Sequence, residues 1–359
     1  MDSSITRILA LDLGKFKTVL CAMEVATREH AFESLATTPA AIEDLLTRHR
    51  TPDASHTLVV IETCDVAGWV HDLCMSAGVK ITIANPRSDA WRWSKVRRKT
   101  DRDDALKLAR LTLLDQLPAV HLPPPTERQK RRLILHRRSI VETRTKCRNQ
   151  VRSIFSQQGL ALARGGKQWT LAGIKQLRDE ARPIAECEVV DLWRGRLHAE
   201  LELLASIGAQ LKVIEARLDD LADDRVKLLQ SVKGVGPRLA EAVVLHLDDP
   251  HRFAREEEVA AYAGLVPRQI ESGEMKRSGR ITRHGPTLLR SLLVESAWTV
   301  WRCNAWARVF VEKLCRGSRS RRKVAIIALA RKLLIMLWAM LRKNEPYRPE
   351  LFEKMVLPA

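Results

Sequence analysis

The sequence predicts a mixed α/β domain at the N-terminus, then long helices that form a coiled coil, then an all-α C-terminal domain. Three observations support this prediction. Short β-like runs alternate with helical ones up to about residue 121, apolar residues then recur every seven positions, and the last third reads as helices around a glycine turn. The 359 residues, 45% of them hydrophobic, are enough for two or three domains with their own cores.

Within the first domain, residues 1–121, three strand-like runs come first and are joined by tight connections. Helical and strand-like runs then alternate, which is typical of a mixed sheet with helices packed on it. The expected strands are residues 7–14, 16–25, 30–36, 56–63 and 79–86. The expected helices are residues 40–50 and 68–78, followed by a helix that starts near residue 101.

The proline-rich segment LPPPTERQ marks the boundary to a middle region, residues 122–225. Residues 128–155 contain ten Lys or Arg and one acid, which predicts a basic helix with an apolar seam at Leu133, Ile140, Cys147 and Ile154. A second helix is expected at 187–222. One heptad position there holds Val190, Leu197, Leu204, Leu211 and Leu218; the other holds Trp193, Ile207, Ile214 and Leu221, and only Glu200 breaks the pattern. This indicates a coiled coil, formed with the basic helix or with a second subunit, and an ordinary bundle helix is the alternative.

The third domain, residues 226–345, is predicted to be helical and is followed by a loose tail at 346–359. Its sequence VKGVGPRLAEAVV resembles a helix-hairpin-helix motif, whose turn presents backbone N–H groups to a phosphate. Two helices packed closely through glycines are the alternative. The residues expected to bind nucleic acid are Lys233, Gly234, Gly236 and Arg238 in this motif, with Arg131 and Arg138 in the basic helix.

Charge and cysteine usage narrow the function. A net charge of +18 and a pI of about 10.0 predict a densely negative partner, for which nucleic acid is the usual choice. The seven cysteines are odd in number and form no CxxC, which argues against a disulfide framework or a structural zinc site. The N-terminus has no signal-peptide pattern, and Arg331 and Lys332 interrupt the apolar stretch 324–341. A soluble cytoplasmic protein with no membrane partner is therefore expected.

Four acidic residues are candidates for a metal site. Asp12 and Glu62 each end an apolar strand-like run that gives no reason to bury an acid. In the stretch KTDRDDALKLAR, Asp101 and Asp104 lie three positions apart and share one helical face. Carboxylates held together need divalent cations, and an oxygen-rich site suits Mg²⁺ or Mn²⁺.

Other interpretations of the acidic residues stay open. A strand-end residue such as Asp12 is more often part of a turn, and Asp101 or Asp103 could simply cap the helix. Asp65, Asp89 and Asp103 are rival ligands. The order of strand, Asp, Gly, hairpin, strand-end Glu and helical Asp pair is that of ribonuclease-H-like nuclease folds, in which paired metal ions act on a phosphodiester.

A polar, basic stretch at residues 260–285 contains Ser272. A serine hydroxyl is a poor nucleophile unless cations or a base stabilise the developing charge, and guanidinium groups do this well around a phosphate. Composition alone favours a loop that grips phosphate without a nucleophile. The nucleic-acid-binding residues expected here are Arg268, Lys276, Arg277, Arg280 and Arg283.

Taken together, these stretches resemble the DEDD transposases of the insertion-sequence-110 family, over nearly the whole chain. The matching segments are LALDLGKFK, VVIET, KTDRDDALKLA, the heptad region, SVKGVGPRLAEAVV and AYAGLVPRQIESG, in that order. LDLG alone is weak, whereas KTDRDDA together with GLVPRQIESG is specific. Lys233 stands where such hairpins often have proline.

The resemblance implies a RuvC-like N-terminal domain in which Asp12, Glu62, Asp101 and Asp104 bind metal, and a C-terminal transposase domain with Ser272 as nucleophile. It also implies a composite site built from different subunits of a dimer or tetramer. The expected partners are double-stranded donor and target DNA and a structured bridge RNA, in the nucleoid of a bacterium. Attack by Ser272 would give a phosphoserine intermediate that allows strand exchange and resealing without ATP.

Three functions other than transposition are also compatible with parts of the sequence. A metal-dependent nuclease or Holliday-junction resolvase with the same core would hydrolyse DNA and would not need Ser272. A sugar-kinase or actin-like ATPase is suggested by LDLGKFKT, but a second glycine-rich phosphate loop is missing from the sequence. A non-catalytic nucleic-acid scaffold would not depend on Asp12 or Asp104.

Overall fold

The computed structural model describes residues 2–85, 100–163, 165–272 and 275–350, without the side chains of residues 269–278. The chain divides into two units, residues Met1–Pro125 and Thr126–Ala359, and each is described by itself. Asp89, one of the rival metal ligands, lies outside the described residues.

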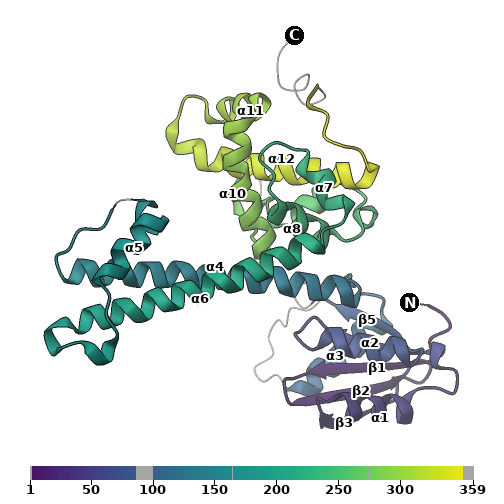
Figure 1. Cartoon of the computed structure of the whole chain (residues 1–359). Coiled ribbons are helices and arrows are strands. Elements are labelled where there is room, and N and C mark those ends of the chain that lie inside the picture. The colour runs from purple at the N-terminus through teal and green to yellow at the C-terminus, as the bar shows by residue number, and fades with distance from the viewer. Residues whose placement is uncertain (1, 86–99, 164, 273–274, 351–359) are drawn as a thin grey trace. The chain divides into compact units, whose positions relative to one another are not determined.

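The first unit contains a five-stranded sheet in the order β3-β2-β1-β4-β5 (Figure 1). Antiparallel pairing joins β1 to β2 and β2 to β3, whereas β4 pairs in parallel with both β1 and β5. The strands are β1 (Arg7–Leu13), β2 (Lys17–Glu24), β3 (His30–Ala36), β4 (Thr57–Glu62) and β5 (Lys80–Ala84). All five lie where the alternating apolar pattern predicts them, so the mixed α/β domain is confirmed.

Helices cover both faces of this sheet. The helices α1 (Pro39–His49) and α2 (Ala67–Ser76) pack on the face formed by Leu9, Leu11 and Ile61. The helix α3 (Asp101–Leu113) packs on the opposite face, where Ala105 and Leu108 contact the strand residues Ile8, Ala10 and Val60. Because successive side chains of a strand alternate between faces, even-numbered residues of β1 and β4 point towards α3.

Two long helices dominate the next part of the chain (Figure 1). The basic helix α4 (Pro125–Gln157) packs against α6 (Leu192–Asp220), and α5 (Leu171–Glu180) lies near one end of the pair. The thiol of Cys147 donates to the carboxylate of Glu200 at 2.8 Å, and Arg137 donates to Glu215 at 2.8 Å. The second helix therefore pairs with the basic helix of the same chain, which is one of the two partners expected for it.

The predicted start of this second helix, residue 187, is wrong. The helix begins at Leu192, and Val190, which continues the heptad, is 80% exposed. Residues 184–186 and 189–191 form short 3₁₀ turns instead. Ile184 folds back onto the helix at Gly195, where an added Cβ would lie 2.8 Å from Ile184. Packing at this glycine outweighs the local heptad pattern.

The remaining helices pack around α12 (Arg322–Lys343) in one apolar core. They are α7 (Asp224–Gln230), α8 (Pro237–Leu247), α9 (Glu256–Tyr262), α10 (Thr287–Cys303) and α11 (Ala305–Cys315). The segment Arg319–Lys343 is long and apolar enough to cross a membrane by length and composition, but 56% of its most apolar window is buried within the protein. Its apolar side chains belong to the helical core.

The C-terminal region is not all-α, in contrast to the prediction. Two antiparallel strands, β6 (Pro267–Ser272) and β7 (Met275–Ile281), form a hairpin within the basic stretch that was expected to be a loop. The polar composition concealed the strands, because both carry charged or polar residues at most positions. Further single 3₁₀ turns lie at Ala54–His56, Lys167–Trp169, Pro250–Arg252 and Arg319–Arg321.

Candidate active site

Asp12 and Glu62 occupy neighbouring positions at the carboxyl ends of β1 and β4. The two strands pair in parallel as far as Leu11 opposite Ile61, and the next residues of the two strands are Asp12 and Glu62. Both side chains are half-buried. By strand alternation they lie on the same face as Ala10 and therefore on the face that α3 covers. The sheet thus brings these two predicted ligands together.

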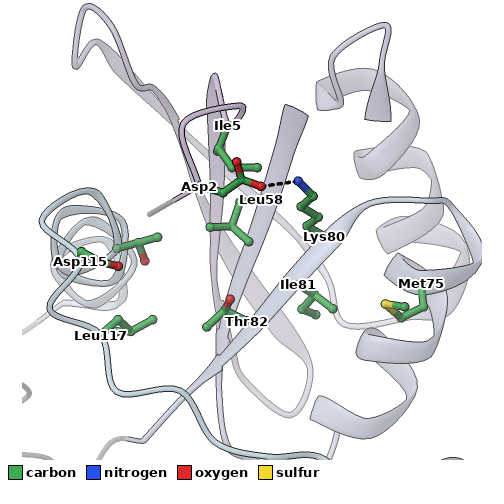
Figure 2. A pocket seen from close by; sticks show the side chains of 10 residues that line it. Asp2, Ile5, Leu58, Met75, Lys80, Ile81, Thr82, Asp115 and Leu117 are labelled. Atoms are coloured by element: carbon green, nitrogen blue, oxygen red, sulfur yellow. Dashed lines mark hydrogen bonds and ion pairs between the residues drawn. The ribbon is translucent and has the colours of Figure 1, made fainter. Parts of the chain in front are cut away.

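The helix α3 runs so that its N-terminus lies at the same edge of the sheet as these carboxylates. Its other end is marked by Thr112 and Asp115, which line a cavity with Leu58 and Lys80 at the amino ends of β4 and β5 (Figure 2). Asp101 and Asp104 lie in the first turn of α3, at the opposite end of the helix. The backbone N–H groups of a helix N-terminus also favour negative charge there.

The aspartates of this turn have different surroundings. Thr100 is the N-cap, and its hydroxyl donates to Asp103 Oδ2 at 2.7 Å while accepting from the Asp103 backbone N–H at 3.3 Å. These hydrogen bonds from Thr100 lower the pKa of Asp103. Asp103 therefore completes a capping box, and neither it nor Asp101 is the N-cap residue. Asp104 is half-buried one position further along, and Asp101 is exposed.

The described structure brings the four acids only partly into the arrangement that a metal site requires. Among the described residues, no three His, Cys, Asp or Glu side chains lie close enough to hold a metal ion. The structure brings Asp12 and Glu62 together and places Asp101 and Asp104 at the same edge and face, without closing the four into one cluster. Carboxylate oxygens are nevertheless the donor type that Mg²⁺ and Mn²⁺ prefer, so the residues fit such a cation. The rival Asp65 is exposed in the segment after β4.

The cavity in Figure 2 is not this site. It opens beside Asp2 and Lys80, whose Oδ2 and Nζ atoms are 2.6 Å apart, at the amino ends of the strands. The acidic residues there are Asp2 and Asp115. None of the predicted ligands lines it.

Ser272, the predicted nucleophile, is the last residue of β6 and pairs with Met275 at the tip of the hairpin. Lys276 and Arg277 follow in β7, opposite Glu271 and Ile270. The hairpin therefore places the serine backbone next to a basic strand.

The base of this hairpin is fixed by residues that sequence reasoning missed. Gly264 and Gly285 both have positive φ, and an added Cβ at Gly285 would lie 1.8 Å from the Tyr262 carbonyl oxygen. Arg290 donates to the carbonyl oxygens of Ala263 and His284, both at 3.1 Å, so its guanidinium joins the two ends of the hairpin. Burial and then Arg283 lower the pKa of Arg290. The only sequence signals were the isolated glycines of AGLVP and RHGP.

The glycine turn between α7 and α8 is well defined. Gly234 has φ of +98°, and an added Cβ would approach the Val300 backbone nitrogen to 3.1 Å. Gly236 is the N-cap of α8 and faces open space, and Lys233 is exposed. The Lys233 carbonyl accepts from Asn304 Nδ2 at 2.8 Å, which attaches the turn to the end of α10.

The arginines that were predicted to bind nucleic acid and whose side chains are described fall into two groups, which leaves out Arg277. Arg268, Arg280 and Arg283 are exposed around the hairpin. The others make contacts within the protein. Arg131 donates to the Leu245 carbonyl at the end of α8 at 2.6 Å, Arg138 pairs with Glu142 and Glu295, and Arg238 pairs with Asp219 and Glu241.

Comparisons with known proteins agree with this architecture. A family model described as "Transposase", for the DEDD enzymes of IS110, matches residues 9–158, and the model "Transposase IS116/IS110/IS902 family" matches residues 226–312. A Pseudomonas aeruginosa protein called "Probable family 20 transposase" is 31% identical, over 81% of this chain and 86% of its own length. The transposase for insertion sequence element IS1111A of Coxiella burnetii is 27% identical, over 81% and 79%. A pilin gene-inverting protein of Moraxella bovis is 26% identical, over 76% of each chain.

A mixed α/β unit with strand-end carboxylates, joined to a basic helical region, is thus the architecture of an enzyme that acts on DNA. The chain belongs to the IS110 family of insertion-sequence transposases. It is a DNA transposase, and membership of the DEDD group suggests dependence on a divalent cation.

Proposed function

We propose that this transposase joins DNA strands through a covalent serine intermediate. Ser272 attacks a DNA phosphodiester, so that a bond forms between its Oγ and phosphorus while the bond from phosphorus to one sugar oxygen breaks. The products are a phosphoserine linkage and a free hydroxyl on the DNA. A hydroxyl of the exchanged strand then attacks the phosphoserine and releases Ser272. Each step conserves one phosphoester bond, so no ATP is required.

The N-terminal unit supports the chemistry in this proposal. Its strand order, with an antiparallel β1-β2-β3 meander and parallel β4 and β5, supports the proposal of a RuvC-like, ribonuclease-H-like domain. Asp12, Glu62, Asp101 and Asp104 would hold Mg²⁺ or Mn²⁺. When bound, such a cation stabilises negative charge that develops on a phosphodiester. The observation that carries this assignment is the parallel register that sets Asp12 beside Glu62, on the face covered by α3.

The C-terminal region contributes the residues that bind the DNA backbone. The α7–α8 pair acts as a helix-hairpin-helix, in which Lys233, Gly234 and Gly236 meet a phosphate at the exposed start of α8. Arg268, Arg280 and Arg283 hold the DNA backbone near the hairpin, and Lys276 and Arg277 add positive charge to β7. These contacts position the duplex without reading its sequence.

Sequence recognition is assigned to RNA in this proposal. A bridge RNA pairs with donor and target DNA, and the protein binds the backbones of all three through its charge of +18. The resemblance to the family supports a dimer or tetramer in which the carboxylates of one subunit serve Ser272 of another. The domain limits 1–121, 122–225, 226–345 and 346–359 remain part of this proposal.

Strand transfer is favoured over simple hydrolysis by two relatives that are called pilin gene-inverting proteins, since inversion of a gene requires rejoining. The alternative is a ribonuclease-H-like nuclease or junction resolvase. A recombination assay with supercoiled donor and target DNA separates the two functions. Ser272→Ala should abolish joined products, while Ser278→Ala, on the neighbouring strand, should retain them. Full rejoining by the Ser272→Ala protein would contradict the serine intermediate, whereas cleavage by the wild type without any joined product would favour hydrolysis.

A further inference from the structure

Three arginines form a row along the second half of the basic helix α4. Arg144, Arg148 and Arg152 are spaced by four residues, so they lie on one face of α4 with steps of about 6 Å along its axis. This part of α4 lies beside α5, at the end of the long helical pair (Figure 1). The Arg144 and Arg148 side chains are half-buried and that of Arg152 is exposed.

Trp169 holds two of these arginines in place. The guanidinium of Arg148 lies 5.0 Å from the centre of the Trp169 ring, and that of Arg152 lies 5.4 Å from it. The indole itself packs on the apolar cluster formed by Val151 and Leu177. A guanidinium stacked on a fixed ring keeps the donors at its edge available and loses little entropy when it binds a ligand.

Among the described residues, this row of arginines has no acidic partner. Within the described part of the chain, no carboxylate pairs with Arg144, Arg148 or Arg152, whereas four other arginines of the paired helices each have one: Arg137, Arg138, Arg194 and Arg217. Arg152 donates a hydrogen bond to the neutral side chain of Asn149, at 2.8 Å. Like charges four residues apart destabilise a helix. The protein therefore tolerates a repulsion that nothing described in its own fold relieves.

Two further observations on Arg148 are consistent with the binding of an anion at this row. Burial, then Arg144 and Arg152, lower the pKa of Arg148. The Nε atom of Arg148 is buried and has no hydrogen-bond partner in the described structure. A guanidinium in this state gains charge compensation when an anion binds beside it.

We propose that Arg144, Arg148 and Arg152, the last two ordered by Trp169, form a binding site for the phosphate backbone of a nucleic-acid strand. The spacing of the row is close to the separation of successive phosphates along a strand, and the guanidinium fork binds phosphate in a bidentate way. The site lies in the helical pair and takes no part in phosphodiester transfer. Its role is to hold a nucleic acid along α4 while the chemistry proceeds elsewhere.

The test is nucleic-acid binding by the full-length protein in buffer with EDTA, so that no transfer chemistry is needed. Fluorescence anisotropy with labelled duplex DNA, single-stranded DNA and duplex RNA of equal length measures Kd over a range of salt concentrations. The variant Arg144→Gln/Arg148→Gln/Arg152→Gln is compared with Lys146→Gln/Lys175→Gln/Lys212→Gln. The control removes the same charge from exposed, unpaired lysines of the same helical region.

The arginine variant should bind at least one type of probe about 10-fold more weakly than the control variant does, and should lower the slope of log K against log salt by about 2 to 3. Loss with RNA alone, DNA alone or both identifies the strand that the site holds. Equal weakening by both variants, or no weakening by the arginine variant, would overturn the proposal.

A variant that retains the three positive charges tests whether misfolding, and not loss of the site, explains weaker binding. Arg144→Lys/Arg148→Lys/Arg152→Lys keeps the three cations but loses the fork and the stacking on Trp169. It should bind the affected probe several-fold more weakly than the wild type, with an unchanged circular dichroism spectrum. Wild-type affinity in this variant would contradict a bidentate phosphate site. Because transfer plays no part in these measurements, their outcome does not depend on the role of Ser272.

Discussion

Asp12 and Glu62 stand side by side at the carboxyl ends of two parallel strands, on the sheet face that α3 covers. Neither acid is needed to build the sheet, whose core is formed by the apolar residues that precede them. The pair is therefore the natural starting point for testing the chemistry of this transposase.

Neutralising either strand-end acid should remove activity without removing DNA binding. Asp12→Asn and Glu62→Gln preserve shape but lose the charge that a divalent cation requires, so strand transfer should fall by a factor of about 10² or more. Transfer is followed by gel analysis of joined products, and binding by anisotropy. Asp65→Asn, at an exposed position nearby, serves as the control. Wild-type transfer by both variants would rule out the metal assignment.

Single substitutions in the first turn of α3 should distinguish the residues that cap the helix from those that bind metal. Thr100→Ala should lower the free energy of unfolding by about 1 kcal/mol, because it removes the N-cap hydroxyl. Asp103→Asn should weaken the same capping box and leave strand transfer intact, whereas Asp104→Asn should abolish transfer. Thermal unfolding and the recombination assay are the two measurements. Loss of transfer in Asp103→Asn, with retention in Asp104→Asn, would reverse the assignment.

The same capping box should make the stability of the fold depend on pH in the acidic range. Hydrogen bonds from Thr100 lower the pKa of Asp103 below its usual 3.8. A depressed pKa stabilises the fold above the unfolded-state value, and this contribution is lost as the pH falls from about 3.8 through the folded-state pKa. Wild-type protein should therefore lose its stability advantage over Asp103→Asn in that acidic range. A difference in melting temperature that stays constant with pH would argue against a charged cap.

The base of the β6–β7 hairpin should tolerate no side chain at Gly285. Its φ of +79° and the close Tyr262 carbonyl imply that Gly285→Ala costs about 1 to 3 kcal/mol and reduces transfer. Gly208→Ala is the control, since this helical glycine of α6 has no atom near its would-be Cβ and should gain about 0.5 to 1 kcal/mol. Denaturant unfolding measures both, and equal effects of the two substitutions would contradict the strained-turn interpretation.

A buried acid next to the glycine turn should make stability depend on pH near neutrality. Burial raises the pKa of Glu241 to about 7, although the adjacent Arg238 favours its charged form. One oxygen of Glu241 accepts from Arg238 at 3.0 Å, and the other has no hydrogen-bond partner among the described residues. An acid with a raised pKa stabilises the fold below its unfolded value of 4.5, and this contribution is lost as the pH rises through 7.

Glu241→Gln should therefore leave stability unchanged near pH 4.5 and raise it relative to wild type at pH 8, by at most about 3 kcal/mol. Denaturant unfolding at a series of pH values gives both curves. A wild-type protein that becomes more stable than Glu241→Gln as the pH rises would show instead that the ion pair with Arg238 dominates.

Much of the fold followed from local patterns, because the sheet strands are short apolar runs bounded by turn residues. The start of α6 did not, since the heptad at Val190 continued past the real helix and the deciding contact, Ile184 on Gly195, joins two separate segments. The β6–β7 hairpin was missed because its strands are mostly polar and their sequences show no alternation of apolar and polar residues that would reveal a period of two.

The site was only partly accessible from the sequence. That Asp12 and Glu62 are acids in unusual places could be seen directly, but their adjacency depends on the parallel register of β1 and β4. The contacts of Arg131 and Arg138 with α8 and α10 arise from tertiary packing, so composition made both look free to bind nucleic acid. The sequence around Arg290 did not indicate its structural role. That role depends on two backbone carbonyl groups that the hairpin brings together.

The most direct test of the central claim is to trap the reaction on DNA that contains a nick opposite the cleavage site and to digest the denatured protein for mass spectrometry. We expect a nucleotide adduct on the peptide that contains Ser272; it should depend on a divalent cation and be absent from the Asp12→Asn protein. Cleaved DNA with free phosphate ends, and no adduct on any peptide, would contradict the serine mechanism and leave hydrolysis as the activity.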